Sequence, residues 1–131
     1  MHSEAHTFKV LTYPKRLQLL QLLSNAGKQI CVCELVDSLA IPQYAVSRHL
    51  KELERAGFIK SDKEGRWVYY SIQDNLDSLK KELVQAIGKI PDTTQKDIQN
   101  RLEKRLQMRV NGKCLLGIQN TKLTSGGNSN A

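Results

Sequence analysis

The sequence has little of what marks a secreted or membrane-bound protein. Its 131 residues include three cysteines, which are too few and too odd in number for a disulfide framework. No apolar run approaches the ~18 residues that a membrane-spanning helix needs, and the N-terminus lacks the apolar block of a secretory signal. We therefore expect a cytoplasmic protein of one ordinary-sized domain, with reduced thiols and no membrane partner.

The sequence also lacks the residue patterns that enzymes use. It has no glycine loop of the phosphate-binding type, no carboxylate pair in an apolar pocket, and no cysteine near a plausible histidine and aspartate. A thiol oxidoreductase would place two cysteines three positions apart beside a βαβ unit, and neither feature is present. We therefore expect a protein that is not an enzyme.

Charge and aromatic side chains are unevenly distributed along the chain. All seven aromatic residues lie between Phe8 and Tyr70, and the net charge is +7, of which residues 1–90 contribute +3. The basic surplus favours a nucleic-acid partner without establishing one. We expect a main unit over residues 1–91, an additional C-terminal helix over residues 92–110 and a flexible tail over residues 111–131 that carries Cys114.

Apolar periodicity and turn residues predict a mainly α-helical fold with a small β-hairpin. Leucines at helical spacing follow Pro14, a residue suited to the first turn of a helix. Gly57 ends a later helical stretch, and the period then changes from 3.6 to 2, which is typical of strands. We expect helices at about residues 8–11, 14–26, 31–40, 43–56, 74–90 and 94–106, and strands at residues 58–61 and 67–72.

The order helix, short turn, helix and hairpin is that of a winged helix-turn-helix. Residues 40–42 form the turn, which makes residues 43–56 the recognition helix. Each polar residue there, taken singly, reads as a solvated side chain, but together they predict DNA binding. The expected DNA-contacting residues are Gln43, Tyr44, Ser47, Arg48, His49 and Lys51 on the helix, with Lys63 and Arg66 at the hairpin tip. Among these, His49 either buttresses the helix or touches the DNA backbone.

The helix expected at about residues 74–90 carries an apolar stripe that is larger than one small core requires. Leu79, Leu83 and Ile87 form this stripe. We expect it to form the interface of a homodimer together with the first helix, because two copies would bury the surplus apolar surface. The expected fold class is therefore a dimeric winged helix-turn-helix.

Three stretches resemble the ArsR/SmtB metalloregulators, a family of dimeric winged-helix repressors. Residues 14–20 are similar to the family's Pro-x-Arg-Leu second helix, and residues 41–50 resemble its Val-Ser-x-His-Leu recognition segment. Residues 31–35, Cys-Val-Cys-Glu-Leu, resemble the Cys-Val-Cys-Asp-Leu inducer box of the arsenic and cadmium/lead branches. Two positions depart from the pattern: Pro42 stands where the family often has a serine N-cap, and Val36 stands where arsenic repressors often have a third cysteine.

The resemblance makes the cysteines candidate ligands of a soft ion. Cys31 and Cys33 would point in nearly opposite directions in a regular helix, so a shared ion requires an irregular turn. Cys114 is the candidate third ligand, from its own subunit or the partner's, and its alternative is an incidental thiol. Free cysteines also pack as small hydrophobes, which is the structural alternative for the pair. Three thiolates suit trivalent arsenic or antimony, whereas tetrahedral zinc normally takes four ligands.

These features together predict a metalloid-responsive transcriptional repressor. An ion-free homodimer would bind an inverted-repeat operator in double-stranded DNA without a cofactor. As(III) or Sb(III) would bind Cys31, Cys33 and Cys114, reshape the helix at residues 31–40 and release the DNA. The zinc site of other family members is not expected, because residues 74–90 contain no histidine. The alternative is a winged-helix regulator that responds to thiol oxidation or to another inducer.

Overall fold

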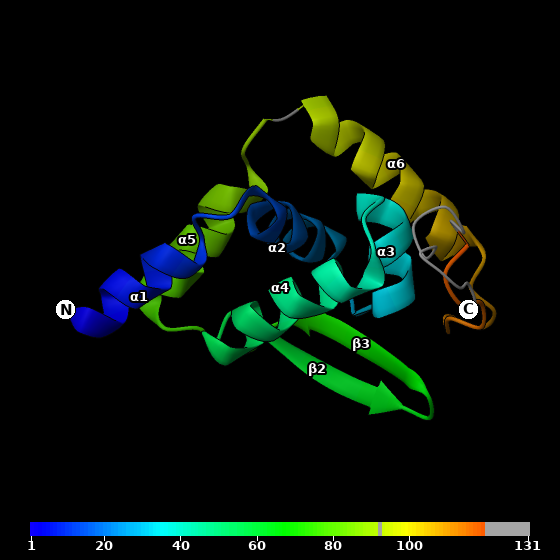
Figure 1. Cartoon of the computed structure of the whole chain (residues 1–131), viewed down its shortest axis with the longest axis horizontal. Coiled ribbons are helices and arrows are strands. Elements are labelled where there is room, and N and C mark those ends of the chain that lie inside the picture. Colours follow the sequence, from blue (N-terminus) through cyan, green and yellow to red (C-terminus); the bar gives the residue numbers. More distant parts are fainter. Residues whose placement is uncertain (92, 120–131) are drawn as a thin grey trace.

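The computed structural model describes residues 1–91 and 93–119, and it is a mainly helical fold with one small sheet. The expected fold class, a winged helix-turn-helix, is confirmed, and α3, α4 and the hairpin follow one another as predicted (Figure 1). The elements are α1 (His2–Val10), α2 (Pro14–Ala26), β1 (Ile30–Cys31), α3 (Val32–Leu39), α4 (Gln43–Arg55), β2 (Ile59–Glu64), β3 (Trp67–Ile72), α5 (Ser78–Gly88) and α6 (Thr93–Gln107).

Local residue chemistry sets the ends of the DNA-reading helices. Pro14 occupies the first turn of α2, and Gly27 ends that helix at φ 63° in the left-handed region that glycine tolerates. Pro42 precedes α4 with φ −60° and ψ 151° and has no capping side chain. The fixed φ of proline therefore starts α4 where the family often uses a serine cap.

The sheet contains a strand that the sequence did not predict. Its order is β1-β3-β2, all antiparallel, and β1 pairs Cys31 with Tyr69. The expectation that a helix begins at Cys31 is therefore wrong by one residue, because β3 recruits Ile30 and Cys31 into the sheet. β2 and β3 form the wing, a hairpin whose turn contains Gly65 at φ 64°.

The core lies where α2, α3 and α4 meet the sheet. Leucines of α2 are buried with Leu35 of α3 and Leu50 of α4, as their helical spacing predicts. α1 is longer than expected and leaves Phe8 half exposed. None of the described helices is long and apolar enough to cross a membrane.

The C-terminal part packs on α3 instead of extending from the core. α6 lies beside α3 (Figure 1) and buries Ile98 and Leu102 in the main core. The following segment places Cys114 at 2% exposure. The expectation of a flexible tail from residue 111 therefore fails for residues 111–119, because polar contacts to α3 and the wing fasten them. The rest of that predicted tail, residues 120–131, lies outside the described residues.

Candidate functional site

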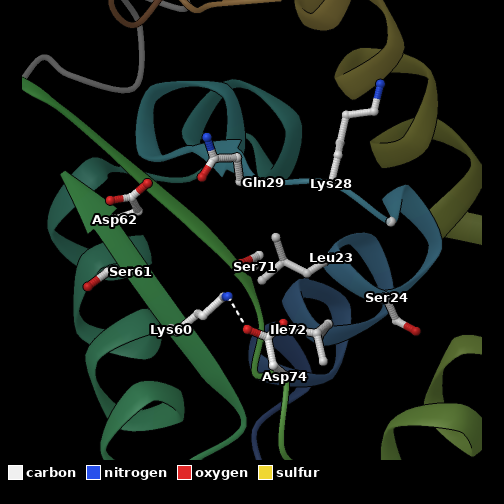
Figure 2. A pocket seen from close by; sticks show the side chains of 11 residues that line it. Leu23, Ser24, Lys28, Gln29, Lys60, Ser61, Asp62, Ser71, Ile72 and Asp74 are labelled. Atoms are coloured by element: carbon white, nitrogen blue, oxygen red, sulfur yellow. Dashed lines mark hydrogen bonds and ion pairs between the residues drawn. The ribbon is translucent and has the colours of Figure 1, made fainter. Parts of the chain in front are cut away.

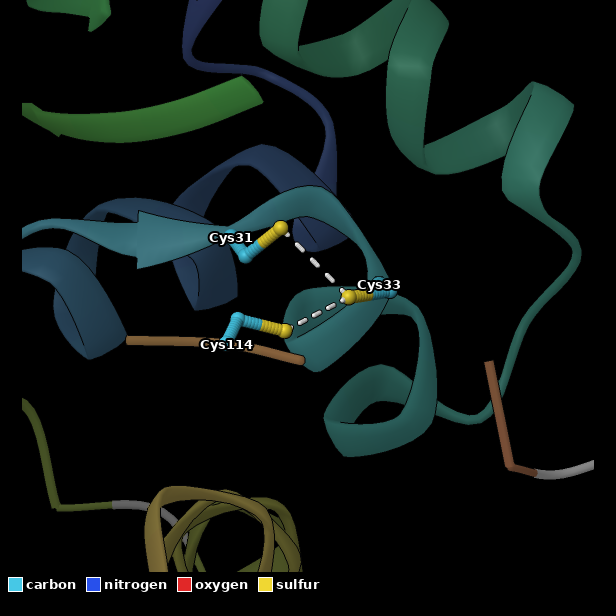
Figure 3. Close-up of side chains that lie close together, drawn as sticks. All are labelled: Cys31, Cys33 and Cys114. Atoms are coloured by element: carbon cyan, nitrogen blue, oxygen red, sulfur yellow. Dashed lines mark hydrogen bonds between the residues drawn. The ribbon is translucent and has the colours of Figure 1, made fainter. Parts of the chain in front are cut away.

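The three cysteines converge in one buried cluster within a single chain. Cys33 Sγ lies 3.4 Å from Cys31 Sγ and 3.2 Å from Cys114 Sγ (Figure 3). All three sulfurs lie within 4.8 Å of one another. Among the described residues, no other three side chains of the metal-ligating types come together in this way. The partner-subunit origin considered for Cys114 is therefore unnecessary.

Cys31 and Cys33 meet without any distortion of α3. Cys31 is the residue before the helix, with φ −75° and ψ 150°, so its side chain does not follow the helical direction. Its backbone N–H donates to Glu34 Oε1 at 2.9 Å, which fixes the start of α3. The irregular turn that a shared ion requires is thus the boundary between β1 and α3.

Cys114 reaches the cluster from a tight turn after α6. Val110 and Lys113 form an antiparallel bridge around Asn111 and Gly112, both at positive φ. The Cys114 backbone N–H then donates to the Tyr69 hydroxyl of β3 at 2.9 Å. This contact ties the third sulfur to the wing.

The segment is also tied to the far end of β2. Lys113 Nζ lies 2.6 Å from Glu64 Oε1. The hydrogen bonds that Lys113 and Gln29 donate to the Glu64 carboxylate lower its pKa. Because this ion pair is exposed, it contributes little stability and serves mainly to set the position of the segment.

Three arginines attach the C-terminal part to α3. Two of them lie on α6, and the third follows its last residue. Arg101 Nε donates to the Ser38 carbonyl at 2.8 Å. Arg105 Nε lies 2.9 Å from Asp37 Oδ2, and Arg109 Nη2 lies 2.6 Å from Glu34 Oε1.

This arginine row was missed by the sequence analysis. Its signal is the spacing of four between the arginines, together with two acids of α3, Glu34 and Asp37, that are three positions apart. Buried ion pairs of this kind specify the docking geometry more than they add net stability.

The thiols differ in acidity because of their mutual hydrogen bonds. The Cys33 thiol donates to Cys31, which lowers the pKa of Cys31 to about 6. The same interaction and burial raise the pKa of Cys33 far above its ordinary value. Burial also raises the pKa of Cys114. The cluster therefore combines one thiol that ionises near neutral pH, Cys31, with two thiols that stay protonated there.

Five expected DNA-contacting residues line one groove of about 650 Å³ between α4 and the wing. Lys51 of α4, Lys63 and Arg66 make this groove basic, as a path for a phosphate backbone requires. Tyr44 and Arg48 lie outside the groove lining, with the Arg48 guanidinium 5.8 Å from the Tyr44 ring centre. The other two expected residues that line the groove are Gln43 and Ser47.

The cysteine cluster borders this same groove. Cys31 and Cys33 form part of its wall, and so do Gly117 and Ile118 of the C-terminal segment. A movement of the cysteines or of the segment that carries Cys114 would therefore change the shape of the surface between α4 and the wing.

His49 faces the body of the protein. Its Nδ1 accepts a hydrogen bond from Arg16 Nε at 3.0 Å, and its ring lies 6.0 Å from that of Tyr13. Arg16 also donates to the Val10 carbonyl at 3.1 Å, so it links α4 to the end of α1. Burial and the Arg16 charge lower the pKa of His49. This geometry is that of the buttressing role considered for His49.

A second hollow, of about 690 Å³, lies between the end of α2 and the outer strand of the wing (Figure 2). Lys60 in its lining is ion-paired with Asp74. The rest of the lining is mixed polar and apolar, and the three cysteines are not part of it. This hollow therefore lacks the soft ligands of the cysteine cluster.

The comparison with known sequences points to one family. Residues 13–61 match the family described as bacterial regulatory protein, arsR family. An uncharacterized HTH-type transcriptional regulator of Methanocaldococcus jannaschii is 38% identical over 86 residues, which cover 66% of this chain and 92% of the relative.

Regulators of arsenic resistance are also among the relatives. An arsenic resistance transcriptional regulator of Pseudomonas putida is 35% identical over 60% of this chain and 64% of its own length. The arsenical resistance operon repressor of Escherichia coli is 38% identical over 53% of this chain and 58% of its own length. The chain thus spans less than two thirds of these two relatives.

The comparison of structures agrees with the sequence matches. Reduced HlyU from Vibrio cholerae superposes with a TM-score of 0.57 at 27% identity, covering 66% of this chain and 85% of that one. HlyU from Vibrio vulnificus, described as a transcriptional regulator, gives 0.54 at 30% identity over 64% of this chain and 82% of that one. With its winged helix and its cysteine box, the chain belongs to the ArsR family of transcriptional repressors, which bind operator DNA.

Proposed function

We propose that this chain is a metalloid-responsive repressor whose operator complex dissociates when As(III) or Sb(III) binds Cys31, Cys33 and Cys114. This proposal rests mainly on one observation. Three buried thiols, from positions up to 83 residues apart, converge within one chain. The arsenic resistance regulators among its relatives support the same inducer class. No cofactor is needed for the DNA-bound state.

The sulfur spacing favours a pyramidal ion over a tetrahedral one. With metal–thiolate bonds of about 2.3 Å, sulfurs at tetrahedral angles would stand about 3.8 Å apart. The separations of Cys33 Sγ from the other two sulfurs, 3.4 and 3.2 Å, correspond to angles of about 90° for such bonds. Two such separations, with all three sulfurs within 4.8 Å of one another, suit a trivalent ion whose lone pair occupies the remaining side.

The binding reaction with arsenite is balanced without a change in charge. The Cys31 thiolate first takes up one proton from the solvent. Three thiols then react with neutral arsenous acid, three As–O bonds break and three As–S bonds form. The three thiol protons leave with the three hydroxyl groups as water. A buried site tolerates this exchange because the product carries no new charge that needs a partner.

Coupling to DNA follows from where the sulfurs are attached. Cys31 belongs to β1, which pairs with β3 of the wing, while Cys33 belongs to α3. Cys114 is held by Tyr69 of β3. An ion that fixes the three sulfurs therefore alters the position of the wing relative to α4, and the coupling is bounded by its differential affinity for the two states. This route replaces the expected reshaping of α3, which the geometry does not require.

The DNA-bound form is proposed to be a cytoplasmic homodimer with one α4 in each half-site of an inverted repeat. Exposed apolar side chains on α1 and just after α5 support this arrangement, although Ile87 of the expected stripe is buried in the chain's own core. Phe8 is 50% exposed and Ile90 is 46% exposed. Gln43, Tyr44, Ser47, Arg48, His49 and Lys51 of α4, with Lys63 and Arg66 of the wing, form or support the proposed DNA surface.

Fluorescence anisotropy tests this function. The full chain is titrated onto labelled DNA from upstream of its own gene, and arsenite, antimonite or zinc is then added. We expect arsenite and antimonite to lower the DNA affinity at least about tenfold and zinc to leave it unchanged. An affinity that arsenite does not alter would contradict the proposal.

The short sulfur separations also favour thiol oxidation as a second candidate signal. Hydrogen peroxide would remove two electrons and two protons from Cys33 and Cys114, forming one S–S bond and two waters. The 3.2 Å separation of these sulfurs supports this pairing. Release of DNA by peroxide but not by arsenite, with a mass loss of two hydrogens, would identify this alternative.

A further inference from the structure

Arg105 places a permanent positive charge against the sulfur cluster. Its guanidinium Nη2 lies 3.3 Å from Cys33 Sγ and 3.8 Å from Cys114 Sγ. The same nitrogen donates to the Leu116 carbonyl at 2.8 Å. The side chain is 5% exposed, and it lies outside residues 13–61, which carry the family match. The arsenite reaction makes no use of this charge.

The charge of Arg105 is shared between an acid and the sulfurs. Its Nε forms an ion pair with Asp37 Oδ2 at 2.9 Å, without the alignment of a hydrogen bond. Asp37 also accepts hydrogen bonds from the Gln119 backbone N–H at 2.9 and 3.1 Å. The pair is neutral as a whole, but its cationic edge faces Cys33 and Cys114.

Soft ions differ in the charge that they leave on three cysteines. Three thiolates around a trivalent ion form a neutral unit. Three thiolates around a divalent ion form a unit of charge −1, while the protons still held by the thiols pass to the solvent and the ion loses its bound waters. A buried anion of this kind is unfavourable unless a cation lies beside it. The guanidinium of Arg105 occupies that position.

We propose that Arg105 is a specificity-determining residue, which allows the same three cysteines to hold a divalent soft cation as a three-coordinate anionic complex. Lead(II) is the appropriate probe, because it is a soft divalent ion whose lone pair also favours three sulfur ligands on one side. The inference rests on the proposed function in one respect, namely that the three cysteines bind an ion. It goes beyond that function by assigning to Arg105 the discrimination between trivalent and divalent ions.

The test compares lead(II) and arsenite binding to full-length variants. Affinities are measured by competition with a chromophoric chelator for lead and a fluorescent dithiol probe for arsenite, and the sulfur-to-lead absorption band is recorded. We expect Arg105→Met to weaken lead binding about a hundredfold, because the anionic complex loses its counter-charge, and to change arsenite binding far less. Arg105→Lys should restore most of the lead affinity because it keeps the charge.

Two further variants separate charge from docking. Arg101→Met removes a neighbouring arginine that contacts the Ser38 carbonyl and no sulfur, so it should leave the ratio of the two affinities unchanged. Arg105→Met combined with Asp37→Asn removes both charges and leaves no unpaired buried acid. This double variant should show the same lead-selective loss even if the single variant fails to fold.

The outcomes distinguish the inference from the proposed function. Equal losses of lead and arsenite affinity in the Arg105 variants would overturn the inference and leave the proposed function intact. A wild-type chain that binds arsenite but not lead would do the same. A wild-type chain that binds lead but not arsenite would contradict the proposed function alone, and one that binds neither would contradict both.

Discussion

Arg109 and Glu34 form a bidentate ion pair that joins the residues after α6 to the start of α3. Arg109 Nε donates to Glu34 Oε2 at 2.8 Å, and Nη2 donates to Oε1 at 2.6 Å. Glu34 is completely buried, and its Oε1 also accepts the backbone N–H of Cys31. One carboxylate therefore positions Cys31 and also the segment that brings Cys114 to the cluster.

Removal of Arg109 should destabilise the fold strongly. Arg109→Met leaves the buried Glu34 carboxylate without its counter-charge, so we expect the free energy of unfolding to fall by about 3 kcal/mol. Urea denaturation followed by circular dichroism measures this change. Arg101→Met is the matched control, because it removes only a hydrogen bond to a carbonyl and should cost about 1 kcal/mol. Equal losses in the two variants would show that Glu34 does not depend on the ion pair.

Replacement of the third cysteine should change the coordination of a bound ion. Cys114→Ser removes one sulfur and leaves the Tyr69 contact, which uses the Cys114 backbone. We expect arsenite affinity to fall at least about tenfold and X-ray absorption to show two sulfurs instead of three. Leu115→Ser, at the exposed neighbour, is the control and should keep three. A three-sulfur shell in Cys114→Ser would eliminate Cys114 as a ligand.

The burial of His49 beside the Arg16 charge should make stability depend on pH. The pKa of His49 is lowered below 6.5 in the folded protein. The unfolded chain therefore binds a proton at His49 more readily than the folded protein does. The stabilising contribution is therefore complete above about pH 6.5 and is lost as the pH falls toward the folded pKa. Melting temperatures at pH 7.5 and 5.5 should differ more in the wild type than in His49→Gln. An equal difference in both proteins would exclude His49 as the source.

The groove between α4 and the wing should contribute phosphate contacts to DNA binding. Lys51→Ala removes an exposed charge of this groove, so we expect weaker binding to all DNA sequences and a salt slope that decreases by about 1. Lys60→Ala is the control, because Lys60 is ion-paired with Asp74 outside the groove. The slope of log affinity against log salt concentration is the measurement. A slope that changes equally in both variants would remove Lys51 from the interface.

The parts of the fold that local patterns determine could be predicted from the sequence. Leucine spacing places α2, Pro42 starts α4, and the alternation from Trp67 to Ile72 gives β3. These signals lie within one element, where side-chain period and backbone geometry are directly linked. The family resemblance then placed Cys31 and Cys33 as a candidate inducer site.

The remaining features depend on contacts between distant parts of the chain. β1 is only two residues long and exists because β3 pairs with it. Cys114 contacts Cys33, which is 81 positions earlier in the sequence. The ion pair between Arg105 of α6 and Asp37 of α3 likewise forms only in the folded chain. No local period encodes such pairings, which is why Cys114 was expected in a flexible tail. The spacing of Arg101, Arg105 and Arg109 was the available clue.

Each chain carries all three sulfurs of the cluster, and this independence has a consequence for dosage. If the repressor works as a dimer, mixed dimers of wild-type and Cys33→Ser chains keep one intact site. Such mixed dimers would bind one inducer ion where a wild-type dimer binds two, and the affinity of the remaining site for the ion would stay the same. Inducer capture would also persist at dilutions where the dimer separates, so the chain could bind the ion before it meets its partner or its operator.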